Sequence, residues 1–325
     1  MGKKKKEREQ FFLKNGGKML EQMISIFNGK CNPIRSFSEE DLMRATNNYD
    51  RRKIRHEDWN FCIYEGTIES RSVLVKKFKK EISTPGGGDP LELVTNETAI
   101  ASNMSNHKNF LKLLGCCLET EIPILVYEFG ENLSRVLVNS SLPWETKLRI
   151  ANEIANAVAY VHYGTSRVII HRDIKIGHIY LNRDNIAKLS EFQMSVPIPS
   201  GETHVDTLVF GTTGHSAPEV LTTGRLTEKS DVYNFGVVLM DILSGKSTWT
   251  WISELRAEDD YEYVDTGFAD TVQLLLRKSN LKEEKGRQRI EFEELILKCL
   301  RQDPDARPTM QEVAQAIKSI RNMSS

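Results

Sequence analysis

The sequence has no long hydrophobic run and no excess of charge of either sign. No stretch of about 18 apolar residues occurs, and no apolar core follows the basic start, so neither a transmembrane helix nor a signal peptide is predicted. Lysine and arginine number 44 and aspartate and glutamate 45, which gives a formal net charge of -1. A dedicated nucleic-acid-binding protein normally has a basic excess, so we expect no nucleic-acid partner.

Cysteine is scarce, and its spacing argues against two kinds of stabilisation. The five cysteines are an odd number and none lies in a C-x-x-C pair, which speaks against a disulfide framework or a zinc site. This usage favours a reducing compartment, and we expect a cytoplasmic protein. The hydrophobic share of 39% is ordinary for a globular chain, and 325 residues suffice for two lobes.

The chain begins with a basic and helical extension, expected over residues 1–47. Gly2 invites myristoylation, but that signal requires Ser or Thr where Lys6 stands. The lysine run is either a solvated tail or a weak contact for an anionic membrane surface. Residues 9–27 predict an amphipathic helix that packs on its own domain or on a partner. Its apolar positions are Phe12, Leu13, Met19, Leu20, Met23, Ile24 and Phe27.

A small β-rich lobe is expected over residues 48–130. Residues 61–80 alternate and contain β-branched side chains, which predicts two strands joined by a turn near Glu69-Ser70. The further elements expected are a helix over 91–104 and strands over 111–118 and 122–129. The short connection between the last two strands predicts an antiparallel sheet with one helix.

A larger and mostly helical lobe is expected over residues 131–325. Apolar residues at helical spacing predict long helices, and short apolar pieces between them predict minor strands. The helices are expected at 144–162, 229–244 and 290–322, and the minor strands at 168–170, 178–181 and 186–189. The predicted fold class is therefore α+β, with two lobes.

Several short motifs occur in one order along most of the chain. They are Val73-Leu74-Val75-Lys76, Glu97, His171-Arg172-Asp173-Ile174-Lys175, Glu191-Phe192-Gln193, Ala217-Pro218-Glu219 and Arg307-Pro308. Each pattern is weak alone, but their order and spacing make chance a poor explanation. From residue 48 to residue 322 the chain resembles the protein kinase superfamily, which implies the two-lobed kinase fold.

The resemblance is closest to plant receptor-like and receptor-like cytoplasmic kinases of the wall-associated type. It is carried by three segments, Phe37–Tyr49, Leu113–Glu119 and Ser230–Val238. Because no extracellular part is expected, the chain is similar to the cytoplasmic subfamily.

The kinase resemblance implies a role for each matching residue. Phosphoryl transfer needs groups that hold ATP and Mg²⁺, place a hydroxyl and neutralise the developing charge. Lys76 matches the lysine that pairs with the phosphates, and Glu97 the glutamate that orients it. Asp173 matches the catalytic base, and Lys175 the lysine that steadies the γ-phosphate. Roles in maintaining the fold are implied for His171, Asp231, Glu219 and Arg307.

The glycine-rich loop of the family is missing. Its three glycine positions correspond to His56, Asp58 and Phe61. Glycine is needed there so that backbone N–H groups can approach the phosphates. Bulky side chains block this approach, and the Asp58 carboxylate would repel phosphate.

The two Mg²⁺ ligands of the family are replaced as well. The metal-binding asparagine corresponds to His178, and imidazole is a poor ligand for a cation that prefers oxygen. Glu191 stands for the metal-binding aspartate, and its extra methylene displaces the carboxylate by about an ångström, a change that can cost about 100-fold in rate. Gln193 stands for the glycine of the same motif.

These changes together predict a pseudokinase with no efficient use of Mg²⁺ and no confident metal site. Residual ATP binding without turnover stays open. A weakly active, atypical Ser/Thr kinase is the alternative, because Lys76, Glu97 and Asp173 are all retained. The Lys76–Glu97 pair has a structural interpretation too, since it can hold the helix in place without chemistry.

A protein of this kind would act through its surfaces. The segment Glu191–Glu219 matches the activation segment, which partners order most easily in this fold. Its hydroxyl residues, Ser195, Thr212 and Thr213 among them, are candidate contact or modification sites, or ordinary loop residues.

The chain also looks like a branch of plant cytoplasmic pseudokinases that act as immune adaptors. Members bind the leucine-rich-repeat part of a coiled-coil nucleotide-binding immune receptor. They also capture a second receptor-like cytoplasmic kinase that a bacterial effector has modified. The resemblance implies the same two partners here, with recruitment to the plasma membrane through them. Met23, Ile24, Phe27 and Ile34 are candidates for the receptor-facing surface, and packing on the small lobe is the alternative.

Overall fold

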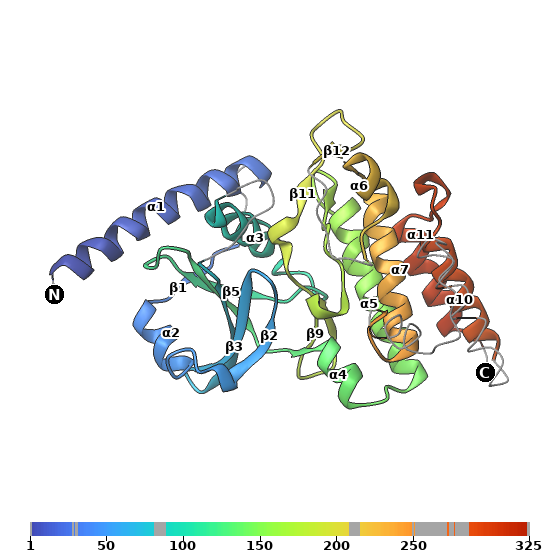
Figure 1. The fold of residues 1–325 in the computed structure, drawn as a ribbon, viewed down its shortest axis with the longest axis horizontal. Helices are drawn as coiled ribbons and strands as arrows, with labels where there is room; N and C mark the ends of the chain where they lie inside the picture. Colours follow the sequence, from blue (N-terminus) through green and yellow to red (C-terminus); the bar gives the residue numbers. More distant parts are fainter. Residues whose placement is uncertain are drawn as a thin grey trace, which may run out of the picture. The chain divides into compact units, whose positions relative to one another are not determined.

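The computed structural model describes residues 2–27, 29, 32–80, 89–207, 215–248, 250, 272, 276 and 286–323. The chain forms two compact units, which are described one at a time (Figure 1). The N-unit consists of Met1–Asn132 and Gly177–Ser195, and the C-unit of Leu133–Ile176 and Val196–Ser325.

A six-stranded sheet in the order β1-β5-β6-β4-β3-β2 is the centre of the N-unit. The strands are β1 (Arg35–Ser36), β2 (Ile54–Glu57), β3 (Phe61–Ile68), β4 (Arg71–Phe78), β5 (Leu113–Cys117) and β6 (Ile124–Glu128). Only the β1–β5 pair is parallel among these neighbours. Glu69 and Ser70 join β3 to β4 with φ values of 49° and 63°. Both lie in the left-handed region that tight hairpin turns use, so the turn predicted there is confirmed.

Helices and short strands complete the N-unit. The helices are α1 (Gly2–Phe27), α2 (Glu39–Ala45) and α3 (Pro90–Met104), with short 3-10 turns η1 (Arg51–Lys53), η2 (Ile176–His178) and η3 (Phe192–Met194). A small sheet has the order β10-β9-β7, with β7 at Glu131–Asn132, β9 at Ile179–Leu181 and β10 at Ala187–Leu189. Ser38 caps α2 by accepting a hydrogen bond from the Asp41 N–H. This bond satisfies one of the backbone donors at the start of the helix.

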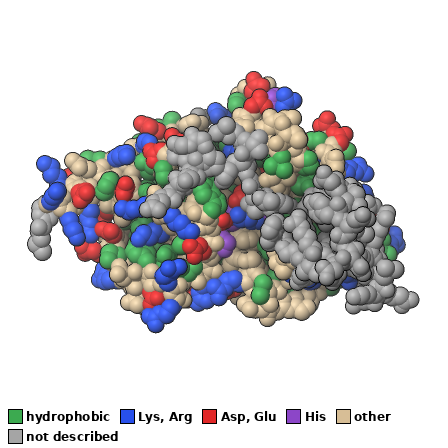
Figure 2. Space-filling view, in the orientation of Figure 1, with side chains coloured by type: hydrophobic (Ala, Val, Ile, Leu, Met, Phe, Trp, Pro, Cys, Tyr) green, Lys and Arg blue, Asp and Glu red, His purple; other side chains and the backbone are tan. Residues whose placement is uncertain are grey.

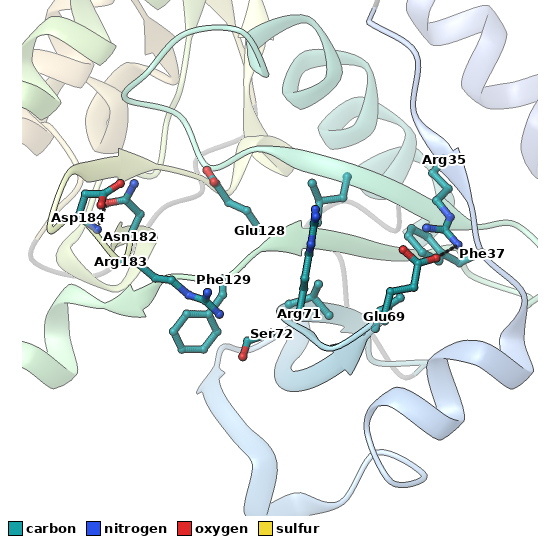
Figure 3. Close-up of a pocket in the computed structure, with 13 residues that line it drawn as sticks. Arg35, Phe37, Glu69, Arg71, Ser72, Glu128, Phe129, Asn182, Arg183 and Asp184 are labelled. Carbon is teal, nitrogen blue, oxygen red and sulfur yellow. Dashed lines mark hydrogen bonds and ion pairs between the residues drawn. The ribbon is translucent and has the colours of Figure 1, made fainter.

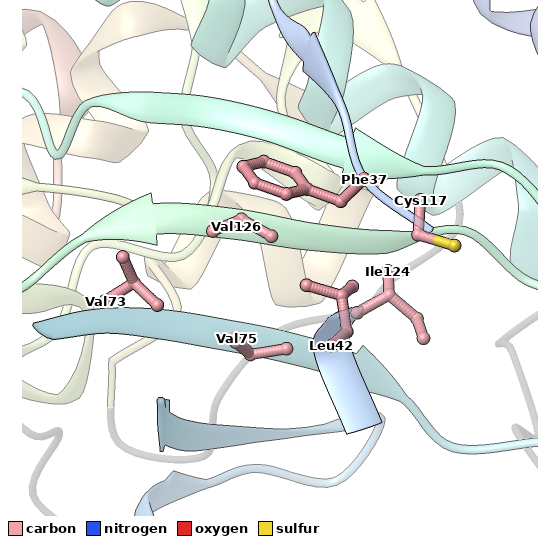
Figure 4. Close-up of a cluster of buried hydrophobic side chains, with 7 residues drawn as sticks. All are labelled: Phe37, Leu42, Val73, Val75, Cys117, Ile124 and Val126. Carbon is pink, nitrogen blue, oxygen red and sulfur yellow. The ribbon is translucent and has the colours of Figure 1, made fainter. Parts of the chain in front are cut away.

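The hydrophobic core beside β4 and β6 holds residues 35–45 against the sheet (Figure 4). Leu42 of α2 is fully buried, and burial of such a side chain stabilises by about 1.5–3 kcal/mol. Its cluster consists of Phe37, Leu42, Val73, Val75, Cys117, Ile124 and Val126. Gly115 lets β1 lie close, because a Cβ atom there would be only 2.0 Å from the Arg35 carbonyl oxygen. Residues 35–45 are therefore an integral part of the N-unit.

Helix α1 packs against α3 through one face and leaves a second apolar face uncovered. The buried side chains are Met19, Met23, Ile26 and Phe27, and the exposed ones are Phe12, Leu13, Leu20 and Ile24. The buried Asn15 amide donates to the carbonyls of Leu118 and Thr120, which ties the helix to the end of β5. The single apolar stripe expected from the sequence is thus divided between two faces.

The C-unit is built from long helices. They are α4 (Leu133–Asn139), α5 (Trp144–Tyr163), α6 (Pro218–Thr223), α7 (Glu228–Ser244), α10 (Arg287–Cys299) and α11 (Met310–Arg321), with a 3-10 turn η4 (Pro304–Ala306). Two-stranded pieces pair β8 (Ile169–Ile170) with β11 (Val196–Pro197), and β12 (Val205–Asp206) with β13 (Arg225–Leu226). Helix α7 is buried over nearly its whole length and packs against α5 and α10. In the described residues, no helix has the length and apolar character that spanning a bilayer requires.

The α+β fold predicted from the sequence is confirmed, with one large difference at the amino terminus. The helix expected over residues 9–27 begins at Gly2. Lysine is a good helix former, and the Arg8 guanidinium contacts the carboxylates of Glu39 and Glu40 in the first turn of α2. Neither effect appears in the apolar periodicity, which is why the first turns were not predicted.

Asp241 near the end of α7 should make the stability depend on pH. Complete burial raises the pKa of its carboxyl to about 7, although the N–H and hydroxyl of Thr248 donate to it. The folded protein then binds a proton that the unfolded chain releases above about pH 4. We therefore expect the free energy of unfolding to fall between about pH 4 and 7, by at most ~1.4 kcal/mol per pH unit.

The measurement is urea unfolding of the Asp241→Asn variant across this pH range. An asparagine oxygen can still accept from Thr248, so we expect the slope to flatten and stability at pH 8 to rise by about 2–4 kcal/mol. Asp206→Asn, at an exposed aspartate of the same unit, is the control and should leave the slope unchanged. An unaltered slope in Asp241→Asn would refute the assignment.

Candidate functional site

Lys76 on β4 is completely buried, and side chains of its own unit accept hydrogen bonds from its ammonium group. Its ammonium group donates hydrogen bonds to the Glu97 carboxylate at 2.5 Å, to the Glu191 carboxylate and to the side-chain oxygen of Gln193. A lysine ammonium has three hydrogens to donate, and these acceptors use all three. A phosphate could bind Lys76 only by displacing one of them.

Two aromatic rings enclose the same ammonium group. Its nitrogen lies 4.0 Å from the centre of the Phe61 ring and 4.7 Å from that of Phe78. Phe61, which stands at an expected glycine position, is itself fully buried. Its ring thus fills space beside Lys76 that a glycine would leave open to a phosphate.

Glu97 on α3 accepts from a second donor. The Tyr127 hydroxyl on β6 donates to its other oxygen at 2.6 Å. The group of Lys76, Glu97 and Glu191 has two carboxylates for one ammonium and no solvent exposure. Burial raises the pKa of Glu97, with the nearby Glu191 acting in the same direction. The Lys76 ammonium group thus already has two carboxylate partners before any nucleotide phosphate approaches.

Glu191 is placed by an unusual backbone conformation. Its φ of 70° lies in the left-handed region, which few residues other than glycine adopt readily. The turn η3 follows at once and carries Gln193 back toward Lys76. The Asn96 side chain on α3 holds this turn by donating to the carbonyls of Phe192, Gln193 and Ser195. The Glu191 carboxylate thus points toward the Lys76 ammonium group.

The segment at the missing glycine loop is closed onto His178. The Asp58 carboxylate lies 3.1 Å from the His178 ring nitrogen, and the His56 ring nitrogen is 3.9 Å from the same carboxylate oxygen. The Lys79 ammonium donates to the Asp58 carbonyl at 2.8 Å, which fixes the loop from the β4 side. The N–H groups of Asp58 and Trp59 donate to the Phe61 carbonyl and the Asp58 carboxylate, so these two are not presented to a phosphate.

Taken together, these residues do not fit Mg²⁺ and ATP as the kinase family binds them. The lysine hydrogens are used, the glycine positions are filled, and both positions matched to metal ligands contact protein groups instead. Mg²⁺ prefers near-octahedral oxygen coordination, and His178 offers nitrogen. No phosphoryl-transfer step can be derived from this arrangement.

The C-unit keeps the catalytic-loop residues in an ordered arrangement. The Asp173 carboxylate, 8% exposed for the residue as a whole, lies 3.2 Å from the Lys175 ammonium. Asp231 accepts from the backbone N–H groups of His171 at 2.7 Å and Arg172 at 2.9 Å. These bonds hold Arg172 at a φ of 72°. The loop is thus held in place by hydrogen bonds and an ion pair within the C-unit.

The ends of the activation segment are anchored. Ser195 near its beginning is 1% exposed, so a contact through its hydroxyl would require the segment to open. The Asn96 side chain donates to the Ser195 carbonyl at 2.8 Å. At the other end, Glu219 forms a two-fold hydrogen-bonded ion pair with Arg307. The candidates Thr212 and Thr213 lie outside the described residues.

A pocket of about 540 Å³ in the N-unit lies away from Lys76 (Figure 3). Arginine and acidic side chains alternate around it, and Arg35 pairs with Glu69 at 2.8 Å. Its remaining charged lining residues are Arg71, Glu128, Arg183 and Asp184. The signs balance, so this pocket has no electrostatic preference for a nucleotide.

Sequence reasoning missed three members of the site. Gln193 was considered only as a lost glycine, although an amide beside a buried carboxylate is a natural lysine ligand. Tyr127 and Asn96 carry no motif, and their contacts depend on the approach of β6, α3 and η3 in space. The ring of Phe61 was predicted to block the loop, but its contact with Lys76 was not foreseen.

Comparison with known proteins places the chain among the kinases. A family model described as protein tyrosine and serine/threonine kinase matches residues 53–317. "Serine/threonine-protein kinase ZRK1" of Arabidopsis thaliana is 37% identical, with 98% of this chain and 94% of the relative aligned. "Non-functional pseudokinase ZED1" of the same plant is 36% identical over the full length of both chains. "Wall-associated receptor kinase 1" is 38% identical over 97% of this chain and 43% of its own length.

The matches extend over the motif-bearing residues and beyond them to the amino-terminal helix. They confirm the predicted resemblance to wall-associated plant kinases and to pseudokinases related to them. The chain therefore belongs to the protein tyrosine and serine/threonine kinase family.

Proposed function

We propose that this protein is a pseudokinase that works as an adaptor through its surfaces. The observation that carries the proposal is the buried Lys76, whose three hydrogens are used by Glu97, Glu191 and Gln193. An active kinase keeps the pair of this lysine with the helix glutamate and directs the remaining lysine hydrogens to the nucleotide phosphates. Here Glu191 and Gln193 take those hydrogens, and displacing Glu191 would leave a buried carboxylate without its counter-ion, which costs several kcal/mol.

The relatives' names support the proposal without being uniform. ZED1 and ZRK2 are named non-functional pseudokinases, whereas ZRK1 is named a serine/threonine-protein kinase. The alternative is therefore a weakly active kinase. Its support is the ordered Asp173–Lys175 pair of the C-unit.

Nucleotide binding separates the two functions. A ligand present at 100 times its dissociation constant adds about 2.7 kcal/mol to the stability of the folded state. We expect no change in the melting temperature with millimolar ATP and Mg²⁺, and no incorporation of labelled phosphate. The comparison variant is Gln193→Gly, which frees one hydrogen of Lys76 and should bind ATP better than the unmodified protein. A Mg²⁺-dependent shift with incorporation that is lost in Asp173→Asn would establish the kinase alternative.

The adaptor role needs a surface for the immune receptor, and we assign it to the outer face of α1. Leu13, Leu20 and Ile24 are 69%, 57% and 52% exposed and recur at helical spacing. Of the positions suggested by the sequence, Ile24 belongs to this face, whereas Met23 and Phe27 are used inside the N-unit. In Figure 2, lysine and arginine side chains are prominent toward the amino-terminal end of this helix, which would add charge to an apolar contact.

Glutamate substitutions test this face. We expect Leu13→Glu combined with Leu20→Glu and Ile24→Glu to weaken binding to a coiled-coil nucleotide-binding leucine-rich-repeat receptor by at least about 100-fold, as loss of central apolar anchors does. The side chains are exposed, so the melting temperature should change little. Val138→Glu, on α4 at a side chain that is 79% exposed, is the control. Equal binding by the triple variant and the control would eliminate α1 as the contact.

The second surface is the activation segment, residues 191–219, proposed to receive a second receptor-like cytoplasmic kinase. The two surfaces are connected in the N-unit, because the Gln22 amide of α1 donates to the Asn96 oxygen at 3.0 Å. Asn96 in turn holds the carbonyls at the start of the segment. A conformational change at the start of the segment would thus be transmitted to α1 through the side chains of Asn96 and Gln22. The four described cysteines are free, which fits the cytoplasm as the working compartment.

A further inference from the structure

We propose that His56, Asp58 and His178 form a binding site for a transition-metal ion, with zinc as the ion of choice. Each side chain offers one ligand atom, and the three atoms lie within 4.8 Å of one another. The expectation against a zinc site rested on cysteine spacing alone and did not consider this set. The inference concerns the N-unit itself and does not depend on the adaptor role.

The spacing of the three atoms suits a shared ion. Zinc bonds of about 2.0–2.2 Å in a tetrahedron place neighbouring ligand atoms about 3.3 Å apart. The Asp58 oxygen is 3.1 Å from the His178 nitrogen and 3.9 Å from the His56 nitrogen. The second distance is long for a hydrogen bond and would close by about half an ångström on joint coordination. The two imidazole nitrogens lie within 4.8 Å of each other and would have to approach as well.

The carboxylate and one imidazole are oriented by their surroundings. The Trp59 N–H donates to the other Asp58 oxygen at 2.7 Å, which turns the first oxygen toward the histidines. Gly177 makes room for His56, because a Cβ atom there would lie 3.1 Å from the imidazole carbon. The site is thus partly organised before an ion arrives, as tight metal binding requires.

The donor set and its exposure select the class of ion. Two imidazoles and one carboxylate suit zinc and related first-row ions, whereas Mg²⁺ requires oxygen ligands. The side chains of His56 and Asp58 are 15% and 14% exposed and that of His178 is buried, so an ion can enter from the loop side. Three protein ligands leave the fourth tetrahedral position for water or for a donor from a partner.

Zinc would link His56 and Asp58, in the segment that corresponds to the glycine-rich loop, to His178 of η2. His178 and Asp58 already make a hydrogen bond, and a metal would replace its proton with two strong bonds. The segment 56–61 would then be fixed over Lys76 with Phe61 in place. The ion would thus stabilise the closed arrangement rather than serve phosphoryl transfer.

The test is zinc binding by the purified full-length protein after treatment with a chelator. We expect one tightly bound zinc per chain by equilibrium dialysis with elemental analysis, and a zinc-dependent rise in melting temperature that Mg²⁺ does not produce. His178→Asn and Asp58→Asn should each weaken zinc binding by about 100-fold or more. Two variants are used so that a failure of one to fold leaves the other.

The control is His204→Asn. His204 and Asp206 repeat the spacing of His56 and Asp58, with 3.8 Å between the ring nitrogen and the carboxylate. Within the described residues, the three-ligand group includes neither of them. This variant should bind zinc as the unmodified protein does. Cobalt substitution gives a second readout, since the spectrum should show tetrahedral coordination without cysteine ligation.

Two results would overturn the inference. One is the absence of stoichiometric zinc in the chelator-treated protein at micromolar free ion. The other is zinc binding that survives in His178→Asn and Asp58→Asn, because the ion would then occupy other ligands.

Discussion

The Lys76→Met variant should lose about 3–5 kcal/mol of stability, enough to lower the melting temperature by roughly 4–7 °C. The lysine is buried together with two carboxylates and an amide. Methionine fills a similar volume and leaves Glu97 and Glu191 without a counter-ion. The same substitution in an active kinase is expected to remove catalysis, whereas here its main effect should be on folding.

The pH dependence of this variant identifies the cause. Burial already raises the pKa of Glu97, and removal of the ammonium group raises it further. A carboxyl whose pKa is higher in the folded state than in the unfolded chain is most stabilising at low pH, and its contribution is lost as the pH rises. We therefore expect the deficit of Lys76→Met to be smaller near pH 5 than at pH 8 in thermal unfolding.

A rescue variant and a control complete this experiment. Replacing Glu97 and Glu191 by glutamine in the Lys76→Met background removes the buried charges, and should recover most of the lost stability. Lys77→Met, at the next position on β4, should cost only about 1 kcal/mol, because its ammonium lies 3.9 Å from the Tyr49 ring centre instead of on a carboxylate. Equal losses for the two lysines would show that the buried charge group is unimportant.

The helices and strands could be predicted from the sequence because the patterns that specify them are local. Alternation predicted β3 and β4, with the turn between them at Glu69-Ser70. Helix α7 was predicted from its apolar spacing to within one residue. In each case, neighbouring residues decide the conformation, so no knowledge of distant contacts is needed.

The candidate site was only partly predictable because its chemistry is made by distant segments. Motif order placed Lys76, Glu97 and Glu191 in one group, but the group's fourth member, Gln193, depends on the left-handed φ of Glu191. No pattern in the sequence encodes that φ. The same holds for Asp58 and His178, which lie far apart along the chain and meet through tertiary structure.

Helix α1 shows the same limit on a larger scale. Its apolar residues were recognised from their spacing, but helical periodicity does not tell which of two faces a neighbour covers. The choice is made by Asn15, whose amide reaches the carbonyls after β5, and by the packing of α1 on α3. Leu13, Leu20 and Ile24 are therefore left outside.

Arg307→Met is the second substitution with a large expected effect, about 3–5 kcal/mol of lost stability. Each of the five guanidinium hydrogens of Arg307 is donated within the C-unit. The acceptors are both carboxylate oxygens of Glu219 and the carbonyls of Lys229, Arg301 and Gln302. The guanidinium also lies 4.9 Å from the Tyr233 ring centre. Methionine would leave three carbonyls and one oxygen of the Glu219 carboxylate without their donor, while the Ser230 hydroxyl still donates to the other oxygen.

Arg307→Lys distinguishes charge from geometry. A lysine keeps the positive charge but has three hydrogens on one nitrogen, so it cannot reproduce the planar contact with both Glu219 oxygens. We expect it to recover less than half of the loss in urea unfolding. If Arg307→Lys were as stable as the unmodified protein, the charge alone would suffice and the five-bond explanation would be wrong.

The same change should also affect the proposed partner surface, because Glu219 ends the activation segment. Arg321→Met is the matched control: Arg321 pairs with Glu145 at 2.8 Å, but both side chains are partly or largely exposed, at 29% and 66%. Such a surface pair contributes about 0–1 kcal/mol, so the control should unfold and bind normally. If Arg307→Met lost capture of the second kinase at temperatures where it is still folded, the anchor would be needed for the shape of the segment as well as for stability. Capture equal to that of the control under those conditions would confine Arg307 to a structural role.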